Sequence, residues 1–400
     1  ATLILSATSI ATHHSVHPPI FTYLHHLRVN YLVDNAHLEV AMVADEKFEG
    51  WCGLDQEAVH GKMVWQHFTP KPFTDDDVEI AISHCGVCAS DLHTLRSGWR
   101  PTPYPCVVGH EIIGKAVRVG RNVKHVAMGD RVGVGGQAGS CLQSDCEHCA
   151  ARDENHCPKA LATYGSIYPD GSKTYGGFAR YNRTPGHFVF KIPDAIPSAA
   201  AAPMLCAGIT VFSPLKYEGC AGKRVGIIGL GGLGHFGVLF ARALGAEQVV
   251  VISHTSSKAA DAAAMGADAF IATSESPDWA VKNQKSLDLI VSTVSTPDMP
   301  LAQYLLLLKV RGTYIQVGAP EEALTGFNMF SIIAKNLKIG GSIIGNTEEI
   351  KEMLQIAADA KVKPWVQERP LKEANQALLD MEDGKARYRY VMVNEEYTGQ

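Results

Sequence analysis

The segment from Cys88 to Glu111 offers the donor atoms that a zinc ion prefers in proteins. Cys88 supplies a thiolate, His110 an imidazole, and the carboxylate of Glu111 follows directly. A catalytic zinc ion takes three protein ligands and keeps one position open for water or substrate. The third ligand must come from elsewhere in the chain, and Cys206 is the candidate. The simpler interpretation is that these cysteines are small buried apolar residues, as unpaired cysteines often are.

A second group of cysteines lies further along the chain, and its members are Cys141, Cys146, Cys149 and Cys157. The spacing of Cys146 and Cys149 lets two thiolates bind one tetrahedral ion, and Cys157 can fold back to the same point. Four residues separate Cys141 from Cys146, so Cys141 as first ligand requires a wide turn. We expect a structural zinc ion without an open position; a disulfide between Cys146 and Cys149 is the competing interpretation.

A glycine-rich segment at 229–234 follows the apolar run 224–228. Its spacing is that of a dinucleotide-binding turn between a strand and a helix. The first glycine of such a turn permits the tight bend, the second lets the backbone approach a pyrophosphate, and the third allows close helix packing. The helix N-terminus then stabilises the phosphate charge. The expected contacts are Gly229, Gly231, Gly232, Leu233 and Gly234.

The end of the next predicted strand distinguishes NAD from NADP. An NAD enzyme carries Asp or Glu there to bind the ribose 2′-hydroxyl, whereas this chain has Ser253, then His254 and, further on, Lys258. A hydroxyl, an imidazole and an ammonium group would instead accept a 2′-phosphate. We therefore expect NADP(H), with Ser253 and Lys258 as the main contacts and His254 as the third; the alternative for His254 is an exposed loop residue.

Two patterns of secondary structure position these groups. From 47 to about 196, short strand-like runs broken by Gly and Pro indicate an irregular, mostly β domain. From 197 to 346, strands and helices alternate, which predicts a doubly wound parallel sheet. The last part of the chain predicts a helix, a strand, a helix and a final strand, at 348–360, 365–368, 373–381 and 388–393.

Together these motifs resemble the zinc-dependent medium-chain alcohol dehydrogenases, in particular the cinnamyl-alcohol-dehydrogenase branch with its fungal NADP-dependent enzymes. The resemblance rests on the segments 86–93 and 109–114 and covers about residues 45–395. It implies an α/β fold in which a Rossmann sheet is joined to a discontinuous, mostly β, GroES-like catalytic domain. The implied boundaries are 42–196 and 347–400 for the catalytic domain and 197–346 for the dinucleotide-binding domain.

The resemblance also implies roles for residues beside the metal. Ser90 would bond the substrate oxygen, and His93 would be the outer base of a proton relay. Asp91 would orient His110 through its other ring nitrogen, and Glu111 resembles the family's acid behind the metal. Each role has a simpler alternative, because Ser90 and Asp91 could cap a helix that begins there, and His93 could be a surface residue.

The implied reaction is hydride transfer between NADP(H) and primary alcohols or aldehydes, cinnamyl or other aromatic as well as aliphatic, in a homodimer with two zinc ions per subunit. Related fungal enzymes carry an arginine in the loop that corresponds to 253–258, and this chain has none there. The preference for NADP is therefore expected to be less strict. The alternatives are an NAD(P)-dependent polyol dehydrogenase and a zinc-free quinone or enoyl reductase of the same fold; Cys88 and His110 argue against the latter.

Composition excludes several other classes of protein. The 400 residues suit two domains, and a hydrophobic content of 46% allows full cores. A net charge of -5 provides no basic surface for nucleic acid or an anionic membrane. The longest apolar run, at 301–308, is too short to cross a bilayer. We expect a cytoplasmic protein with a small-molecule substrate.

Residues 1–41 differ from the rest of the chain. They contain six of the 17 histidines and a single basic residue, Arg28. Pro18 and Pro19 interrupt the apolar core that a secretory signal requires. We expect an unstructured or misassigned extension with Met42 as the original start; metal binding by the histidines is the alternative.

Overall fold

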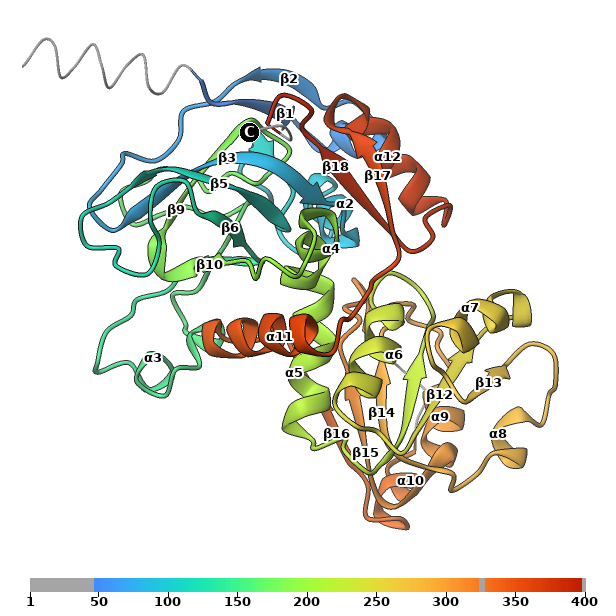
Figure 1. Ribbon diagram of the computed structural model, residues 1–400. Helices are drawn as coiled ribbons and strands as arrows, with labels where there is room; N and C mark the ends of the chain where they lie inside the picture. Colours follow the sequence, from blue (N-terminus) through green and yellow to red (C-terminus); the bar gives the residue numbers. More distant parts are fainter. Residues whose placement is uncertain (1–46, 324–327, 398–400) are drawn as a thin grey trace, which may run out of the picture. The chain divides into compact units, whose positions relative to one another are not determined.

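The computed structural model describes residues 47–323 and 328–397, so the predicted extension 1–41 lies outside the described residues. The first part of the chain is built mainly from short strands, as expected from its Gly and Pro content (Figure 1). These strands are β1 (Glu49–Gly53), β2 (Val64–His67), β3 (Asp77–Gly86), β4 (Cys106–Val107), β5 (Ile112–Val119), β6 (Arg131–Val134), β7 (Gln137–Gly139), β8 (Leu161–Ala162), β9 (Tyr181–Pro185) and β10 (Val189–Lys191). The short helices between them are η1 (Gln56–His60), α2 (Ala89–Leu95), α3 (Glu147–Ala150), η2 (Glu154–His156) and η3 (Gly186–Phe188).

The C-terminal part of the chain completes the main sheet of this region. Strands β17 (Val366–Pro370) and β18 (Arg389–Val393) join a seven-stranded sheet in the order β10-β6-β5-β3-β18-β17, with β9 also paired to β3. Strand β18 runs antiparallel to β3, and Met392 lies opposite Cys85. The prediction of a discontinuous, mostly β domain is therefore confirmed.

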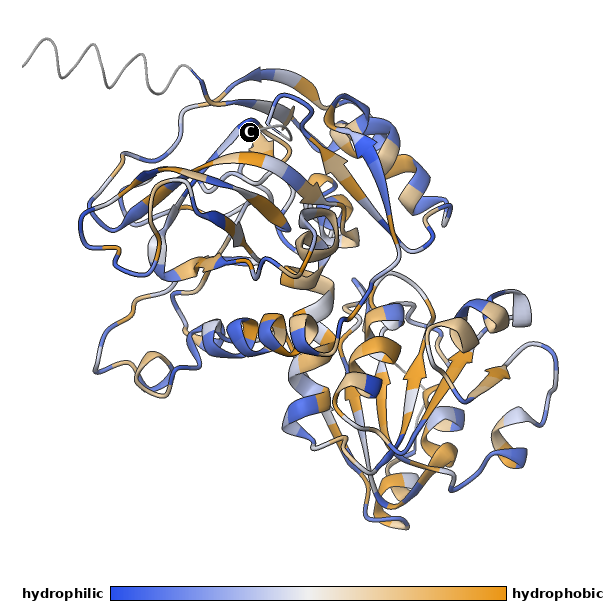
Figure 2. Ribbon diagram, viewed as in Figure 1, coloured by the Kyte–Doolittle hydropathy of each residue, from blue (hydrophilic) through white to orange (hydrophobic). Residues whose placement is uncertain are grey.

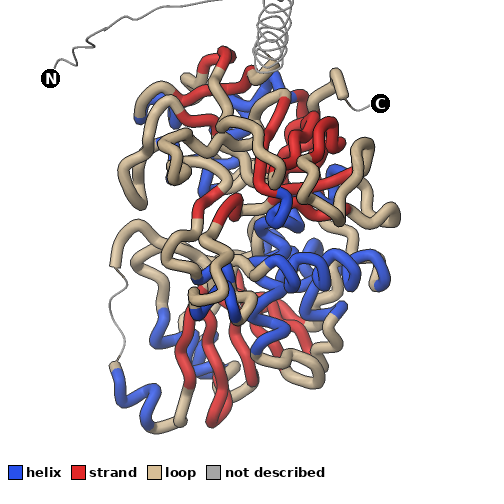
Figure 3. Tube along the Cα trace, turned by 90° about the vertical axis from the view of Figure 1, so that its left-hand side faces the viewer, coloured by secondary structure: helices blue, strands red, loops and turns tan. Residues whose placement is uncertain are grey.

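The alternating part of the chain forms one six-stranded parallel sheet. Its strands are β11 (Arg224–Ile228), β12 (Gln248–Ser253), β13 (Ala269–Ala272), β14 (Leu287–Ser292), β15 (Leu308–Gln316) and β16 (Lys338–Gly341). The order β13-β12-β11-β14-β15-β16 is that of a dinucleotide-binding fold, in which the strand order reverses beside the first strand, β11, while all strands stay parallel. The predicted Rossmann sheet is confirmed, and Figure 3 shows these strands side by side.

Helices cover both faces of this sheet. On one face lie α5 (Ile209–Tyr217), α6 (Gly234–Ala243) and α7 (Ala259–Ala264), and on the other lie α8 (Trp279–Lys282) and α9 (Leu301–Leu307). The helices α4 (Ser198–Pro203) and η4 (Met204–Gly208) precede α5, and α4 packs against β3 of the seven-stranded sheet. The remaining helices are η5 (Ser256–Lys258), α10 (Met329–Ile333), α11 (Thr347–Asp359), η6 (Leu371–Glu373) and α12 (Ala374–Glu382). Alternate residues of a strand point to opposite faces. Accordingly, Ile227 packs in a core with Phe212 and Phe240, whereas Ile228 packs in another with Trp279. Figure 2 shows the central strands of this sheet as mostly apolar.

One continuous helical run, Ser198–Tyr217, corrects the prediction that the apolar run at 301–308 is the longest. The run is apolar enough to cross a membrane by length and composition, with a mean hydropathy of 1.5. However, 89% of its most apolar window is buried inside the protein, so it is a core helix. Its middle, Met204–Gly208, is a π-helix, a wide turn that is frequent at functional sites.

A buried carboxylate ties the segment that carries the second cysteine group to the start of α11. Glu154 lies in η2 and is only 2% exposed. It accepts hydrogen bonds from the backbone N–H and the hydroxyl of Thr347 and lies 3.1 Å from His187 Nε2. Burial alone would raise the pKa of Glu154, but the hydrogen bonds from His187 and Thr347 overcome it and hold the pKa at about 2.

We expect Glu154→Gln to lower the free energy of unfolding by about 1.5–3 kcal/mol near neutral pH, because it removes hydrogen bonds to a buried charged group. The folded-state pKa is depressed below the ordinary 4.5, so the contribution is complete above pH 4.5 and is lost as the pH falls toward 2. Denaturant titrations of both proteins should therefore differ most near neutrality and converge in acid. The exposed Glu147, changed to Gln, is the control; an equal effect there would contradict the prediction.

Candidate active site

Three distant segments bring their metal-binding side chains to one buried point. Cys88 directly precedes α2, His110 follows β4, and Cys206 lies in the π-helical turn. The Nε2 atom of His110 lies 3.0 Å from Cys206 Sγ, and the sulfurs of Cys88 and Cys206 are 3.9 Å apart. With an oxygen of Glu111, these donor atoms all lie within 4.8 Å of one another. Two sulfurs, one imidazole nitrogen and a carboxylate oxygen form a donor set that suits zinc.

Asp91 fixes the two loops that present Cys88 and His110. One carboxylate oxygen accepts a hydrogen bond from the backbone N–H of Cys88 at 2.9 Å, and the other accepts one from Gly109 at 3.0 Å. Among the described residues, no hydrogen bond joins Asp91 to the His110 ring, so Asp91 positions the ligands through the backbone. This differs from the role implied by the resemblance. Tyr164 stacks on the His110 ring instead, with ring centroids 5.2 Å apart.

Arg389 is a site residue that sequence reasoning missed. This side chain, in β18, is 3% exposed and donates a hydrogen bond to Glu111, which is fully buried. The second oxygen of Glu111 has no hydrogen-bond partner in the described residues, and Glu111 is a member of the donor cluster. No local sequence signal marks Arg389, since it lies 278 residues from its partner.

The cluster is electrostatically coupled. The hydrogen bond with Cys206, together with the charges of His110 and Arg389, holds the pKa of the Cys88 thiol well below its usual range. Burial raises the pKa of Glu111 to about 7, although the guanidinium of Arg389 opposes this rise. The lowered pKa of Cys88 favours its thiolate at neutral pH, and the thiolate is the form that binds a metal ion.

The predicted relay residues lie on α2. The Oγ atom of Ser90 is 3.5 Å from Cys88 Sγ, so its hydroxyl reaches the cluster. His93 is three residues further on and therefore lies on the same face of the helix. Its Nδ1 contacts Glu321 and lies 3.1 Å from a guanidinium nitrogen of Arg96.

Trp99 stacks on the ring of His93 at a centroid distance of 4.3 Å. Sequence reasoning did not find Glu321. A cavity of about 390 Å³ lies beside these residues, and His93 and Glu321 are part of its lining. His93, the predicted relay residue, thus borders an open space large enough for a small molecule.

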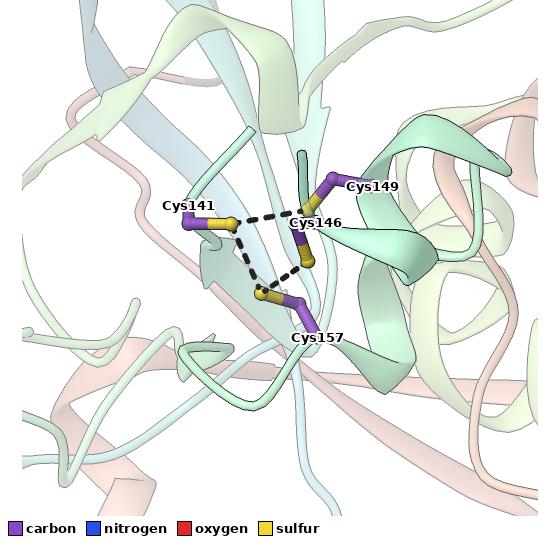
Figure 4. A group of neighbouring side chains, drawn as sticks. All are labelled: Cys141, Cys146, Cys149 and Cys157. Carbon is purple, nitrogen blue, oxygen red and sulfur yellow. Dashed lines mark hydrogen bonds between the residues drawn. The ribbon is translucent and has the colours of Figure 1, made fainter. Parts of the chain in front are cut away.

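The second cysteine group also converges, as Figure 4 shows. Cys141 Sγ lies 3.6 Å from the sulfurs of both Cys149 and Cys157, and Cys146 Sγ lies 4.0 Å from Cys157 Sγ. The four ligand atoms lie within 4.8 Å of one another. The wide turn after Cys141 therefore still brings its sulfur to the group, and all four cysteines are free thiols. This arrangement fits a tetrahedral ion and leaves no donor position for substrate.

The glycine-rich turn has the geometry that a bound pyrophosphate requires. Gly229 has a positive φ of 85°, which favours glycine. A Cβ atom at Gly234 would lie 1.8 Å from the carbonyl oxygen of Gly229, whereas one at Gly231 would meet nothing within 4 Å. Gly231 thus leaves an open approach, and a Cβ at Gly232 would lie 2.9 Å from the guanidinium of Arg389. These observations fit a dinucleotide at the N-terminus of α6.

The loop at the end of β12 carries the residues expected at a 2′-phosphate. Ser253 is the last residue of β12, and His254 is exposed. The ammonium group of Lys258 donates a hydrogen bond to the carbonyl oxygen of Leu230 at 2.9 Å, so it lies against the glycine-rich turn. One acid does contact this loop. Glu275, which lies three residues after the end of β13, accepts a hydrogen bond from the backbone N–H of Ser256 at 2.7 Å.

Comparison with known proteins agrees with the fold and the motifs. Residues 74–194 match the family described as "Alcohol dehydrogenase GroES-like domain", and residues 232–359 match "Zinc-binding dehydrogenase". The chain is similar to NADP-dependent alcohol dehydrogenase 6 of Saccharomyces cerevisiae, with 41% identity over 87% of this chain and 97% of the relative. It is also similar to cinnamyl alcohol dehydrogenase 2 of Arabidopsis thaliana, with 40% identity over 88% and 92% of the two chains.

Two solved structures agree as well. A cinnamyl alcohol dehydrogenase from Sorghum bicolor has 34% identity and a TM-score of 0.82 over 86% of this chain and 97% of the other. One from Helicobacter pylori, solved in complex with NADP(H), has 32% identity and a TM-score of 0.79 over the same shares. The chain therefore belongs to the zinc-binding alcohol dehydrogenases, in the cinnamyl-alcohol-dehydrogenase branch, and is an oxidoreductase that interconverts alcohols and aldehydes.

Proposed function

We propose that this protein transfers a hydride between NADP(H) and primary alcohols or aldehydes at a zinc ion held by Cys88, His110 and Cys206. The observation that carries the proposal is the convergence of these three side chains, from three distant segments, on one buried point. A zinc-free reductase of the same fold has no use for such a donor set. The names of the relatives, an NADP-dependent alcohol dehydrogenase and a cinnamyl alcohol dehydrogenase, support alcohols and the corresponding aldehydes as the substrate class, aromatic ones included.

Zinc at this site would act as a Lewis acid on the substrate oxygen, and NADP(H) would supply or accept the hydride. Side chains of the protein would transfer the hydroxyl proton of the substrate. The Oγ of Ser90, beside the cluster, would hold the hydroxyl proton of an alcohol substrate and pass it outward. The Nδ1 of His93 is engaged by Glu321, so Nε2 is the atom that would take the proton toward solvent.

Arg389 lies beside both the metal cluster and the glycine-rich turn. Its guanidinium neutralises Glu111 behind the metal and approaches Gly232 in the glycine-rich turn. A planar guanidinium suits phosphate as well as carboxylate. We therefore assign Arg389 to the pyrophosphate, together with the N–H groups of 229–234, and to the positioning of Glu111.

We further propose a second, structural zinc ion at Cys141, Cys146, Cys149 and Cys157, and a cytoplasmic homodimer. Strand β16 lies at the end of the six-stranded sheet, where a second copy could continue it. Apolar side chains around it are exposed, among them Phe330 and Ile333 at 68% and Ile343 at 61%. Exposed apolar groups gathered at one sheet edge favour burial against a second subunit. The domain boundaries given above, with 197–346 as the cofactor domain, remain part of this proposal.

Cys88→Ser should abolish catalysis because it removes a metal ligand. We expect NADPH oxidation with benzaldehyde to fall by at least about 100-fold, since even outer residues of metal sites contribute 10–100-fold. Metal analysis of the purified variant should show the loss of one zinc ion per subunit. Cys220→Ser, at a buried cysteine outside both groups, should leave turnover and zinc content unchanged. Undiminished turnover of the Cys88 variant would refute the metal mechanism.

Cys141→Ser separates the structural site from the catalytic one. Loss of one thiolate from a closed four-ligand site should release that ion and lower the thermal unfolding midpoint by several degrees. Zinc content should fall from about two ions to about one per subunit, while the folded fraction keeps its specific activity. A variant with full zinc content would show that Cys141 is not a ligand.

His93→Asn tests the relay. Proton transfer by a positioned side chain contributes roughly 10²–10⁴-fold to rate, and an outer relay residue should lie at the lower end. We expect alcohol oxidation to fall by about 100-fold with unchanged zinc content, and partial recovery at higher pH, where hydroxide replaces the base. A pH profile that keeps its wild-type shape would argue that His93 is only structural.

A further inference from the structure

The loop that follows β12 lacks an arginine, but the C-terminal segment brings one to it. Arg387 lies between α12 and β18, two residues before Arg389 in the chain. Its guanidinium carbon is 5.8 Å from the centre of the Tyr388 ring. The ammonium group of Lys258 is 5.4 Å from the centre of the same ring. One aromatic ring thus carries two cations from segments that are far apart in sequence.

The charges around this ring are not balanced. Asp261 is the carboxylate beside this ring: Tyr388 Oη donates a hydrogen bond to it at 2.5 Å, and Arg387 Nε lies 3.9 Å away. Glu275 bonds the backbone of Ser256 and is no ion-pair partner of either cation within the described residues. Burial, together with the nearby guanidinium of Arg387, lowers the pKa of Lys258. Two cations therefore lie near one ring, and Asp261 is the carboxylate that pairs with Arg387 there.

The two cations border the place where the adenosine end of a dinucleotide would lie. Lys258 Nζ contacts the carbonyl oxygen of Leu230 in the glycine-rich turn, and Ser253 ends the neighbouring strand. Arg389, on the same C-terminal segment as Arg387, approaches Gly232 in that turn. A surplus of positive charge beside a phosphate-binding turn favours a further anionic group.

We propose that Arg387 is a specificity-determining residue for NADP(H), which binds the 2′-phosphate from the C-terminal segment together with Lys258 and Ser253. This inference rests on the proposed use of NADP(H). The guanidinium presents a planar fork of N–H donors that matches two phosphate oxygens, and Lys258 adds a point charge. The side chain of Arg387 is 46% exposed, so it remains accessible to a ligand.

The pairing of Arg387 with Asp261 does not account for this arrangement. Its N···O distance is 3.9 Å, and a half-exposed pair of this kind contributes little to stability. Replacement of Arg387 should therefore change cofactor recognition much more than folding.

Calorimetric titration with 2′,5′-ADP and with 5′-AMP tests the proposal without catalysis. We expect the wild type to bind 2′,5′-ADP more tightly, and Arg387→Gln to weaken 2′,5′-ADP about tenfold or more while 5′-AMP binding is unchanged. Arg387→Lys, which keeps the charge without the fork, should lose less. Lys385→Gln is the control, because Lys385 lies on the same segment but pairs with Asp380 and Asp383. In kinetics, the KM for NADPH should rise with little change in kcat.

The outcomes separate the two proposals. A wild type that binds both nucleotides equally would overturn the use of NADP(H), and this inference with it. A wild type that prefers 2′,5′-ADP, with the full preference kept in both Arg387 variants, would overturn the role of Arg387 alone. Equal weakening of both nucleotides would show that Arg387 acts on structure. If Arg387→Gln does not fold, the comparison of Arg387→Lys with wild type decides between the same results.

Discussion

The buried ion pair between Glu111 and Arg389 is the interaction on which the arrangement of the site depends. Both side chains are almost fully inaccessible, so neither charge could be tolerated there without the other. Glu111 follows the ligand His110, and Arg389 opens the last strand of the seven-stranded sheet. The pair therefore joins the metal site to the C-terminal strand. It also sets Arg389 against the glycine-rich turn, so that metal and cofactor sites share one cation.

A second constraint is the helical run Ser198–Tyr217. It is buried because it is apolar, and its residues belong to the same core as strands of the six-stranded sheet. A regular α-helix would repeat its side chains every 3.6 residues. The π-helical turn at Met204–Gly208 changes that phase at the point where Cys206 meets His110 and Cys88. The core helix thus delivers a polar ligand without exposing its apolar surface.

The C-terminal segment has a larger role than its length suggests. Between α12 and β18 it presents Arg387, Tyr388 and Arg389 in succession. Tyr388 contacts Asp261 in α7, while Arg389 contacts Glu111 near the metal cluster. A chain that returns to its first sheet in this way can line a cofactor site along its length. Its two arginines stand on either side of one tyrosine in the sequence.

Local sequence patterns were sufficient for the chemistry that is encoded locally. Three such signals depend on residues that are close in the chain: the glycine spacing at 229–234, the absence of an acid directly after β12, and the spacing of Cys146 and Cys149. Alternation of strands and helices likewise predicted the parallel sheet, because its hydrophobic periodicity is a local property. The apolar run at 198–217 carries a weaker local signal than the leucines at 301–308, because it is rich in Ala, Gly and Thr.

What the sequence determined by itself was thus the type of each donor and the succession of strands and helices along the chain. Only the tertiary structure decided which distant groups meet: Arg389 with Glu111, Glu321 with His93, Tyr164 with His110, and Arg387 with Lys258 across the ring of Tyr388. These contacts depend on how β18 pairs with β3 and how loops from separate segments converge. No short-range pattern carries that information, because the partners are brought together by the packing of whole sheets.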